Sequence, residues 1–433
     1  MAKIKVAGKG AYGIVYLATD ANNLKENKKN IPEDELRAVK RSFKEKSTTG
    51  YGNLREANML TILSGHPYIV NLKNIEYSDP FKNTDKPMTP IGKTDFSKMH
   101  EDKMLFVMEF LPYNGEDYIR ENHCSPFVIK VLIMQFMLAI EYMHSRGVVH
   151  RDIRTSNVLI SKDEDDNHEL KLCDFGLSRI MGDGKYTPGT ITYCYRAPEV
   201  CTSSSYGKKA DIWSAGCVIY EFLARDYLIK GSKDDNEEVF NNILGRLPNE
   251  PDKKTIKKLF NINQEFTPNT KPPKGGRMNY IKRMKLSNRF RKEFESVPGS
   301  LDELEDLLEN MLCLDPDERY TATKCLDHPF FEWTRDHINK IRADFPPEPP
   351  PLPFYNIYPC IERSWAMGLA FSIFNKKTKL EKKIPFDNIE EPDSMYLTST
   401  VKKWYSHRIL FHAIDIFDQY ITHRLTVDKT DIR

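Results

Sequence analysis

The residues with the clearest capacity for chemistry lie in one short polar stretch. His150-Arg151-Asp152-Ile153-Arg154-Thr155-Ser156-Asn157 places the carboxylate of Asp152 shortly before the amide of Asn157. A second carboxylate, Asp174, follows in Asp174-Phe175-Gly176. A carboxylate can accept the proton of a reacting hydroxyl, and amide and carboxylate oxygens can hold a metal ion. Because short motifs recur by chance, the interpretation depends on the elements around them.

A glycine-rich segment near the N-terminus could bring backbone close to phosphate groups. Gly8-Lys9-Gly10-Ala11-Tyr12-Gly13 lies between a strand pattern at Ile4 and Val6 and another at residues 15–18. Glycine allows backbone angles and close approaches that a Cβ would forbid. Taken alone, the pattern is equally typical of a plain hairpin turn. A strand after the glycines, where a dinucleotide-binding unit needs a helix, argues against that class of protein.

A lysine and a glutamate downstream could form an ion pair beside a bound phosphate. Lys40 ends an apolar strand pattern, and Glu56 lies among apolar residues with helical spacing over residues 54–63. In most sequences such a lysine is an exposed edge residue and such a glutamate is solvated. Gly50 and Gly52 stand at the helix entry, where each costs roughly 1 kcal/mol in a helix interior. We therefore expect the first turns to be poorly ordered until something packs on them.

The remaining motifs follow in a fixed order. Glu199 closes the run Tyr195-Arg196-Ala197-Pro198-Glu199, Asp211 opens an apolar helix, and Arg319 is suited to pair with Glu199. Together, the glycine segment, Lys40, the His-Arg-Asp…Asn loop, Asp-Phe-Gly and Ala-Pro-Glu resemble the protein kinase family. The resemblance implies an α+β fold with a small β-rich N-terminal lobe and a larger, mostly helical C-terminal lobe.

The expected domain organisation combines this resemblance with the composition of the tail. A protein kinase domain is expected over residues 1–334, with the lobes dividing near residues 110 and 111. A Pro-rich linker over 335–356 and a helical extension over 357–433 follow, and residues 409–421 resemble part of a cyclin box. A plain helical extension packed on the kinase core is the other reading. Within the lobes, residues 69–72 and 104–108 predict strands, and residues 127–142 predict a buried core helix.

The resemblance also implies roles for individual residues. Asp152 would accept the substrate proton, supported by Lys40, Glu56, Arg154 and Thr192. Asn157 and Asp174 would hold Mg²⁺ against the phosphates of ATP. The residues expected to bind ATP are Ala7, Gly8, Lys9, Gly10, Ala11, Tyr12, Gly13, Ile14, Val15, Ala38, Lys40, Met108, Glu109 and Leu111.

Several details resemble the cyclin-dependent kinases and their proline-directed relatives, notably Tyr195–Glu199 and the run Asp327-His328-Pro329-Phe330-Phe331. The resemblance implies a Ser/Thr protein kinase that acts on Ser/Thr-Pro sites. It also implies a cyclin-like activator, in a separate chain or in the tail, on the helix of Glu56. A phosphate on Thr187 opposite an arginine cluster could order a loop. The expected regulatory residues are Thr187, the inhibitory tyrosine Tyr12, and the phosphate-receiving Arg55, Arg151 and Arg179.

Two departures from that family affect the interpretation. Of its cyclin-binding helix motif only Arg55-Glu56 remains, and Arg154 replaces the lysine usual in Ser/Thr kinases. The wider guanidinium fork is consistent with a slower enzyme. Thr192 matches the threonine that braces the catalytic aspartate in Ser/Thr kinases. The alternatives are a pseudokinase or scaffold, and an adaptor whose tail recruits a separate kinase; the intact catalytic residues argue against the first.

Composition narrows the remaining classes. The 433 residues carry a net charge of +2, which argues against nucleic acid as the main partner. The eight cysteines form no Cys-x-x-Cys pair, a pattern that fits reduced thiols better than disulfides or a zinc site. We find neither a signal-peptide pattern nor an uninterrupted apolar run of membrane-spanning length. A cytoplasmic or nuclear protein without a membrane partner is the resulting expectation.

Overall fold

The computed structural model describes residues 2–9, 13–19, 31–42, 51–76, 105–122, 124–180, 191–202, 206–231, 235–259 and 276–346. The chain divides into two compact units, which are described separately. In the first unit are the described residues of Met1–Asn58 and Leu72–Phe110, and in the second those of Met59–Asn71 and Leu111–Pro349. Residues Met59–Asn71, which the sequence analysis put in the N-terminal lobe, therefore group with the second unit.

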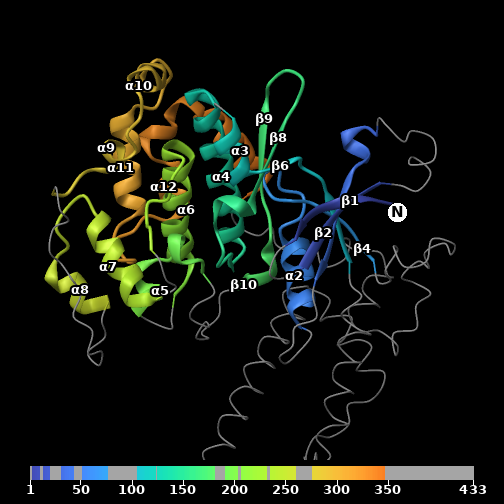
Figure 1. Cartoon of the computed structure of the whole chain (residues 1–433), viewed down its shortest axis with the longest axis horizontal. Helices are drawn as coiled ribbons and strands as arrows, with labels where there is room; N and C mark the ends of the chain where they lie inside the picture. Colours follow the sequence, from blue (N-terminus) through green and yellow to red (C-terminus); the bar gives the residue numbers. More distant parts are fainter. Residues whose placement is uncertain are drawn as a thin grey trace, which may run out of the picture. The chain divides into compact units, whose positions relative to one another are not determined.

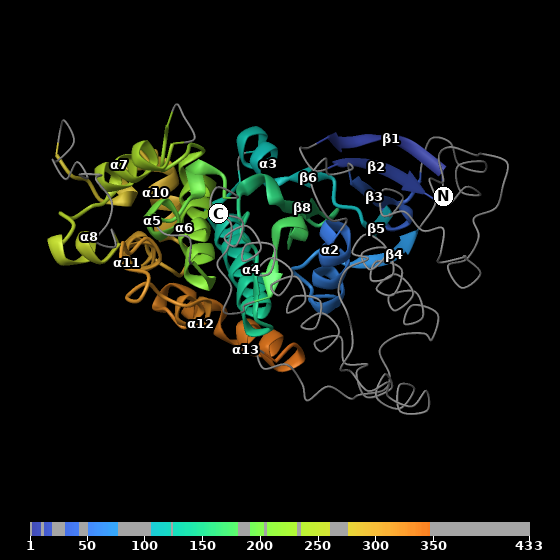
Figure 2. The same cartoon turned by 90° about the horizontal axis from the view of Figure 1, so that it is seen from below.

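The first unit is built on a five-stranded antiparallel sheet with strand order β1-β2-β3-β5-β4, visible in Figure 2. Successive side chains of a strand point to opposite faces of a sheet. One face carries an apolar cluster of Tyr16, Ala18, Val39, Leu105 and Val107. The strands are β1 (Ala2–Lys9), β2 (Gly13–Thr19), β3 (Arg37–Ser42), β4 (Leu72–Glu76) and β5 (Leu105–Glu109), with the short turn η1 (Glu33–Glu35) before β3.

The helix α2 (Tyr51–Ile62) carries Glu56 and runs from the first unit into the second. It begins at Tyr51, so Gly52 lies in its first turn and Gly50 lies outside the described residues. The prediction of a strand over residues 69–72 is wrong for residues 69–71. β4 starts at Leu72, and Ile69 makes only an isolated bridge to Leu172.

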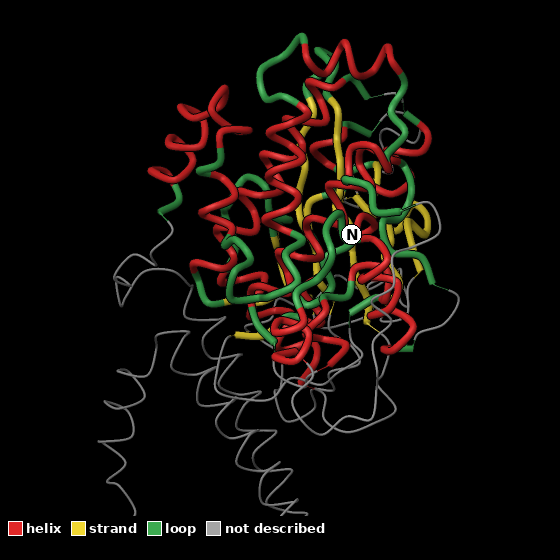
Figure 3. Tube along the Cα trace, turned by 90° about the vertical axis from the view of Figure 1, so that its left-hand side faces the viewer, coloured by secondary structure: helices red, strands yellow, loops and turns green. Residues whose placement is uncertain are grey.

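The second unit is organised around two long buried helices, α4 (Pro126–Ser145) and α6 (Lys208–Ala224), which pack on each other (Figure 1). Ser125 caps α4 by accepting a hydrogen bond from the backbone N–H of Val128, and Pro126 takes the first helical position, where no donor is needed. The core helix predicted at residues 127–142 is confirmed. Figure 3 shows that helix (red) prevails along the described trace.

Short strands and turns of the second unit surround the polar motifs. One sheet has the order β6-β8-β9 and a second pairs β10 with β7. The strands are β6 (Tyr113–Asn114), β7 (Val148–Val149), β8 (Val158–Lys162), β9 (His168–Leu172) and β10 (Arg179–Ile180). The 3₁₀ turns are η5 (Thr155–Asn157), η6 (Phe175–Leu177), η7 (Tyr193–Tyr195) and η8 (Pro329–Thr334).

The other helices of this unit complete its core. They are α3 (Gly115–Glu121), α5 (Pro198–Thr202), α7 (Asn236–Arg246), α8 (Lys253–Leu259), α9 (Tyr280–Arg283), α10 (Asn288–Glu295), α11 (Leu301–Met311), α12 (Ala322–Leu326) and α13 (Arg335–Asp344).

Within the described part of the chain, α4 is the single helix long and apolar enough to cross a membrane, and 83% of its apolar stretch is buried inside the protein. The core helix of a globular unit meets the same test. A buried ammonium ties α4 to its neighbours, since Lys130 Nζ donates to the carbonyl oxygens of Phe294, Val297 and Pro298 at 2.8, 2.9 and 3.1 Å. These bonds satisfy all three donors of the lysine and hold the end of α10 against α4.

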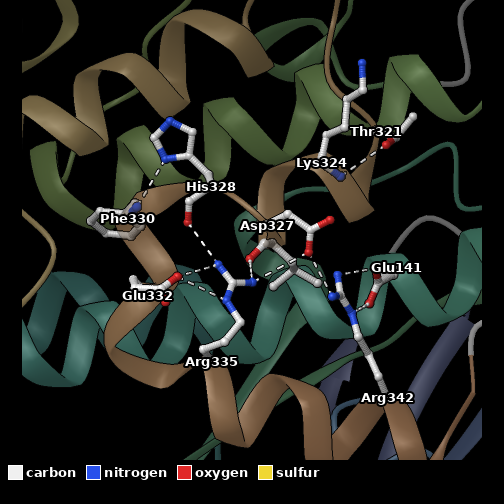
Figure 4. Close-up of polar contacts among 10 residues, drawn as sticks. Glu141, Thr321, Lys324, Asp327, His328, Phe330, Glu332, Arg335 and Arg342 are labelled. Atoms are coloured by element: carbon white, nitrogen blue, oxygen red, sulfur yellow. Dashed lines mark hydrogen bonds and ion pairs between the residues drawn. The ribbon is translucent and has the colours of Figure 1, made fainter.

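The helix α13 closes the second unit at its C-terminal side. Arg342 donates through Nη2 and Nε to the two oxygens of Glu141 on α4 at 2.7 and 2.9 Å, and through Nη1 to Asp327 at 2.8 Å (Figure 4). The prediction that the linker starts at residue 335 is therefore wrong, because residues 335–344 form this anchored helix. The rest of that predicted linker from residue 347, and the cyclin-box-like extension over 357–433, lie outside the described residues.

Candidate active site

In the first unit the structure brings Lys40 and Glu56 together. Lys40 Nζ donates to Glu56 Oε1 at 2.6 Å, and the two side chains are 9% and 5% exposed. Removing one partner of a buried ion pair leaves an uncompensated charge, which is strongly unfavourable. The carboxylate therefore holds the ammonium in place at the middle of β3.

The register of the sheet gathers four of the predicted ATP-binding residues on one face. Lys40 is directly opposite Val15 on β2, and Ala38 is directly opposite Met108 on β5. Residues opposite each other in antiparallel strands share a face, and residues two apart on a strand do so too. Val15, Ala38, Lys40 and Met108 thus form one surface, whereas Ile14 packs against the apolar cluster on the other face.

The other predicted ATP-binding residues fall into three groups. Ala7, Gly8 and Lys9 end β1, where Gly8 pairs with Val15 and Lys9 with Ile14, and Gly13 opens β2. Gly10, Ala11 and Tyr12 lie outside the described residues. Glu109 is the last residue of β5, and Leu111 belongs to the second unit.

In the second unit a buried carboxylate holds the backbone of the polar loop. Asp211, the fourth residue of α6, accepts hydrogen bonds from the backbone N–H of His150 at 2.8 Å and of Arg151 at 3.0 Å. Arg151 has φ = 71°, in the left-handed region that residues with a Cβ rarely occupy. Such a conformation costs of order 1–3 kcal/mol and persists where the surroundings impose it. Asp211 supplies that constraint.

The ring of His150 links this loop to the Asp-Phe-Gly segment. Its Nδ1 accepts from the backbone N–H of Asp152 at 3.3 Å, so Nε2 carries the proton and donates to the carbonyl of Cys173 at 3.0 Å. The ring also lies 4.9 Å from the ring of Phe175. Asp174, between these two anchored residues, has φ = 62°. The strained backbone at Asp174 is therefore held from both sides.

Asp152 is surrounded by the residues that the sequence analysis assigned to it. Asn157 Nδ2 donates to its Oδ2 at 2.8 Å, and the hydroxyl of Thr192 donates to its Oδ1 at 3.3 Å. Thr192 accepts in turn from Arg154 Nη1 at 3.3 Å, while Arg154 Nε donates to Ser156 at 2.5 Å. Thr192 thus bridges the cation and the carboxylate, and Arg154 reaches Asp152 through it.

Burial raises the pKa of Asp152 above its ordinary value, and the nearby charge of Asp174 raises it too. Arg154, His150 and the hydrogen bond from Asn157 act in the opposite direction. A raised pKa makes a carboxylate a better proton acceptor while it stays ionised at neutral pH.

The donor set for a metal ion is limited to oxygen atoms. Asn157 directs its amide nitrogen at Asp152, which leaves its Oδ1 for another partner, and Asp174 contributes a carboxylate. One or two protein oxygens, completed by phosphates and water, are what Mg²⁺ takes in phosphoryl-transfer sites. Among the described residues no cluster of three or more His, Cys, Asp or Glu could hold a metal by itself. The residues present therefore fit Mg²⁺ bound together with a phosphate substrate.

Two of the predicted phosphate-receiving arginines converge. Arg151 Nη1 and Arg179 Nη1 both donate to the carbonyl oxygen of Leu177, at 3.4 and 3.3 Å. Arg151 Nε also donates to the hydroxyl of Tyr206 at 3.0 Å. Arg55 lies on α2, and its side chain and the whole of Thr187 are outside the described residues.

The predicted pair of Glu199 and Arg319 is confirmed. Both oxygens of Glu199 accept from Arg319, at 2.7 and 3.0 Å, and both residues are buried.

Sequence reasoning missed Asp211 as a support of the loop and Tyr206 as a partner of Arg151. The sequence indicates only that Asp211 starts a buried helix, and its partner His150 is 61 residues away in the chain. The one signal was a carboxylate at the start of an otherwise apolar helix.

Comparison with known proteins agrees with this geometry. The family model for the protein kinase domain matches residues 1–331. The chain belongs to the protein kinase family. Its two-lobed α+β fold, predicted from the sequence, is confirmed.

Similar curated proteins are cyclin-dependent kinases. The chain is 30% identical over 362 residues to Cyclin-dependent kinase G-2 of Oryza sativa, covering 81% of this chain and 43% of the relative. It is 32% identical over 337 residues to Cyclin-dependent kinase-like 5 of Homo sapiens, covering 76% and 30%. It is 32% identical over 340 residues to Probable cyclin-dependent kinase 10 of Dictyostelium discoideum, covering 76% and 78%. The chain thus spans less than half the length of the first two relatives.

The role of Asp211 leads to a prediction about the loop. We expect Asp211→Asn to speed hydrogen exchange at the amides of His150 and Arg151, because an amide side chain offers one acceptor oxygen where the carboxylate offers two. The thermal midpoint should also fall, since a lost buried bond to a charged group costs about 1.5–3 kcal/mol. Mass-spectrometric hydrogen exchange on the loop peptide measures the effect.

The matched control is Asp306→Asn, which changes an exposed aspartate that also accepts from a histidine, His328, at 2.8 Å. Loop exchange should be unchanged in that variant. Equal exchange in wild type and Asp211→Asn would contradict the assignment.

Proposed function

We propose that the protein is a Ser/Thr protein kinase that transfers the γ-phosphate of ATP to protein hydroxyls. The observation that carries this proposal is the arrangement at Asp152, where Asn157 and Thr192 each hydrogen-bond one carboxylate oxygen. Membership of the protein kinase family supports it, and so do the buried pair of Lys40 and Glu56 and the oxygen donors of Asn157 and Asp174.

Each residue then has a defined task. Asp152 orients the substrate hydroxyl and accepts its proton, and Lys40, held by Glu56, neutralises phosphate charge. Asn157 Oδ1 and Asp174 would hold Mg²⁺, which when bound neutralises the charge of the phosphates. Arg154 places a positive charge beside the reacting centre, and its hydrogen bond to Thr192 holds it there. Catalysis of this kind depends on positioning and electrostatics.

The first test is phosphoryl transfer itself. We expect the full-length wild type to move radiolabelled phosphate from ATP to a Ser-Pro peptide, and Asp152→Asn to lower kcat by about 10²–10⁴, because the amide cannot accept the proton. Glu164→Gln serves as the matched control, since it neutralises an exposed carboxylate in the hairpin between β8 and β9. Absence of transfer by the wild type, with or without phosphate on Thr187, would favour a scaffold.

The pH dependence of kcat is a second readout of the same residue. Asp152 must be ionised to act, so the rate should fall as the pH is lowered through its pKa, which burial raises. Because the charge of Arg154 lowers that pKa, Arg154→Met should move the acid limb to higher pH. An acid limb that stays in place in this variant would argue against Asp152 as the acceptor.

We further propose the proline-directed specificity and the control by phosphorylation of the cyclin-dependent kinases. The similarity to curated cyclin-dependent kinases supports this, as does the convergence of Arg151 and Arg179 on one carbonyl oxygen. A phosphate on Thr187 would offer both guanidinium groups a charged acceptor in place of that neutral one. A cytoplasmic or nuclear location stays a prediction from composition.

Thr187→Ala tests this control. We expect the fully phosphorylated wild type to exceed the variant in kcat by one or more orders of magnitude, and Arg179→Ala to have little additional effect once Thr187 is changed, because the two act as one unit. Thr323→Ala, at an exposed position on α12, is the matched control. Independent, additive effects of the two substitutions would count against a Thr187–Arg179 switch.

We also propose that the C-terminal extension, or a cyclin-like partner, packs on α2 and seats Glu56 against Lys40. Gly52 in the first turn of α2 supports this, because glycine weakens the helix where packing would have to support it. Deleting all residues after Pro353 should lower kcat strongly, and adding the extension back as a separate chain should restore part of it. Unchanged kcat and KM in the truncated protein would reject the proposal.

A further inference from the structure

A second buried carboxylate of α6 lies under the active-site loop. Glu221 is 0% exposed, and its Oε2 accepts hydrogen bonds from the hydroxyl of Tyr195 at 2.6 Å and from the hydroxyl of Thr155. The two hydroxyl oxygens are themselves 3.2 Å apart. Thr155 and Tyr195 are 0% and 4% exposed. Two buried hydroxyl groups from different parts of the chain therefore donate to the same oxygen atom of Glu221.

Thr155 and Tyr195 belong to two turns that adjoin the residues of the active site. Thr155 opens η5, which ends at Asn157, and it directly follows Arg154. Tyr195 ends η7, and its backbone N–H donates to the carbonyl of Thr192 at 2.9 Å. The carbonyl of Tyr195 also accepts from Ser214 of α6 at 2.8 Å. Glu221 thus joins the turn beside Asp152 to the turn beside its partner Thr192.

The two carboxylate oxygens of Glu221 differ in how many hydrogen bonds they accept. Among the described residues, Oε1 has no hydrogen-bond partner, and the nearest cation, Arg120 Nη2, is 4.0 Å away. Arg120 instead approaches Glu116 at 2.9 Å. Burial raises the pKa of Glu221, whereas the hydrogen bonds from Thr155 and Tyr195 and the charge of Arg120 favour its ionised form.

The turn η5 also lies close to the start of α3. A Cβ at Gly115, the first residue of α3, would lie 2.8 Å from the carbonyl oxygen of Thr155. Thr155 therefore contacts two elements, α3 through its backbone carbonyl and α6 through its hydroxyl.

We propose that Glu221 is a positioning residue for phosphoryl transfer, which holds η5 and η7 together through Thr155 and Tyr195 so that Asp152 meets Thr192. The inference rests on the proposed kinase activity. It assigns Glu221 no contact with substrate. Its effect passes through the Thr192–Asp152 hydrogen bond, and this distinguishes it from a residue that only stabilises the fold.

The test uses Thr155→Val and Tyr195→Phe, which remove one hydroxyl each and keep the side-chain shape, in the full-length chain. We expect kcat to fall about 10- to 100-fold with KM for ATP nearly unchanged, because a misplacement of about 1 Å can cost about 10²-fold. Glu221→Gln should behave alike; if it fails to fold, the two hydroxyl variants still decide the matter. Thr334→Val is the matched control, since it removes a buried hydroxyl that bonds Met134 Sδ at 2.9 Å in η8.

A double-mutant cycle separates positioning from plain stability. In a Thr192→Val background, Thr155→Val should lower kcat by less than about twofold, because coupled residues do not add. An equal loss in both backgrounds, or a loss no larger than that of Thr334→Val, would overturn the role of Glu221. Absence of phosphoryl transfer by the wild type is a different result, since it would reject the proposed kinase activity itself.

Discussion

The polar loop depends on its hydrogen bonds to the carboxylate of Asp211. Its two oxygens receive the backbone N–H groups of His150 and Arg151, and Nε2 of His144 lies 3.0 Å from Oδ2. Arg151 adopts a left-handed conformation that its side chain disfavours, so the loop needs an outside constraint to keep it. The constraint works because α6 is buried along nearly its whole length and cannot yield.

Two further sets of contacts position the residues around this loop. His150 connects the loop to the Asp-Phe-Gly segment, because its ring donates a hydrogen bond to the carbonyl of Cys173 and packs on Phe175. Glu221, near the other end of α6, ties Thr155 to Tyr195. One apolar helix thus carries two buried acids, and each accepts hydrogen bonds from a segment next to Asp152 or Thr192. Rigid support of this kind suits a reaction whose catalysis consists mainly of positioning.

Several features of the fold could be predicted because local pattern or motif order carries them. The apolar run of α4, the strands on either side of the glycines and the pairing of Glu199 with Arg319 are of this type. Boundaries were less predictable. The strand β4 begins later than expected, because Ile69 bridges to Leu172 in the second unit. The C-terminal linker was predicted too early, because Arg342 finds Glu141 and Asp327, contacts that no local pattern of residues 335–344 indicates.

The sequence by itself determined the class of protein, since the order and types of the reacting residues suffice to identify a kinase domain, and it also named Thr192 as the partner of Asp152. Only the tertiary structure decided what holds those residues in place. Asp211 acts on His150, 61 residues away, and Glu221 acts on Thr155, 66 residues away. A buried acid on an apolar helix has the same sequence appearance whether its partner is near or far. The physical reason is that a buried carboxylate needs hydrogen-bond donors close to it in the folded protein. The packing of α6 decides which donors lie close enough.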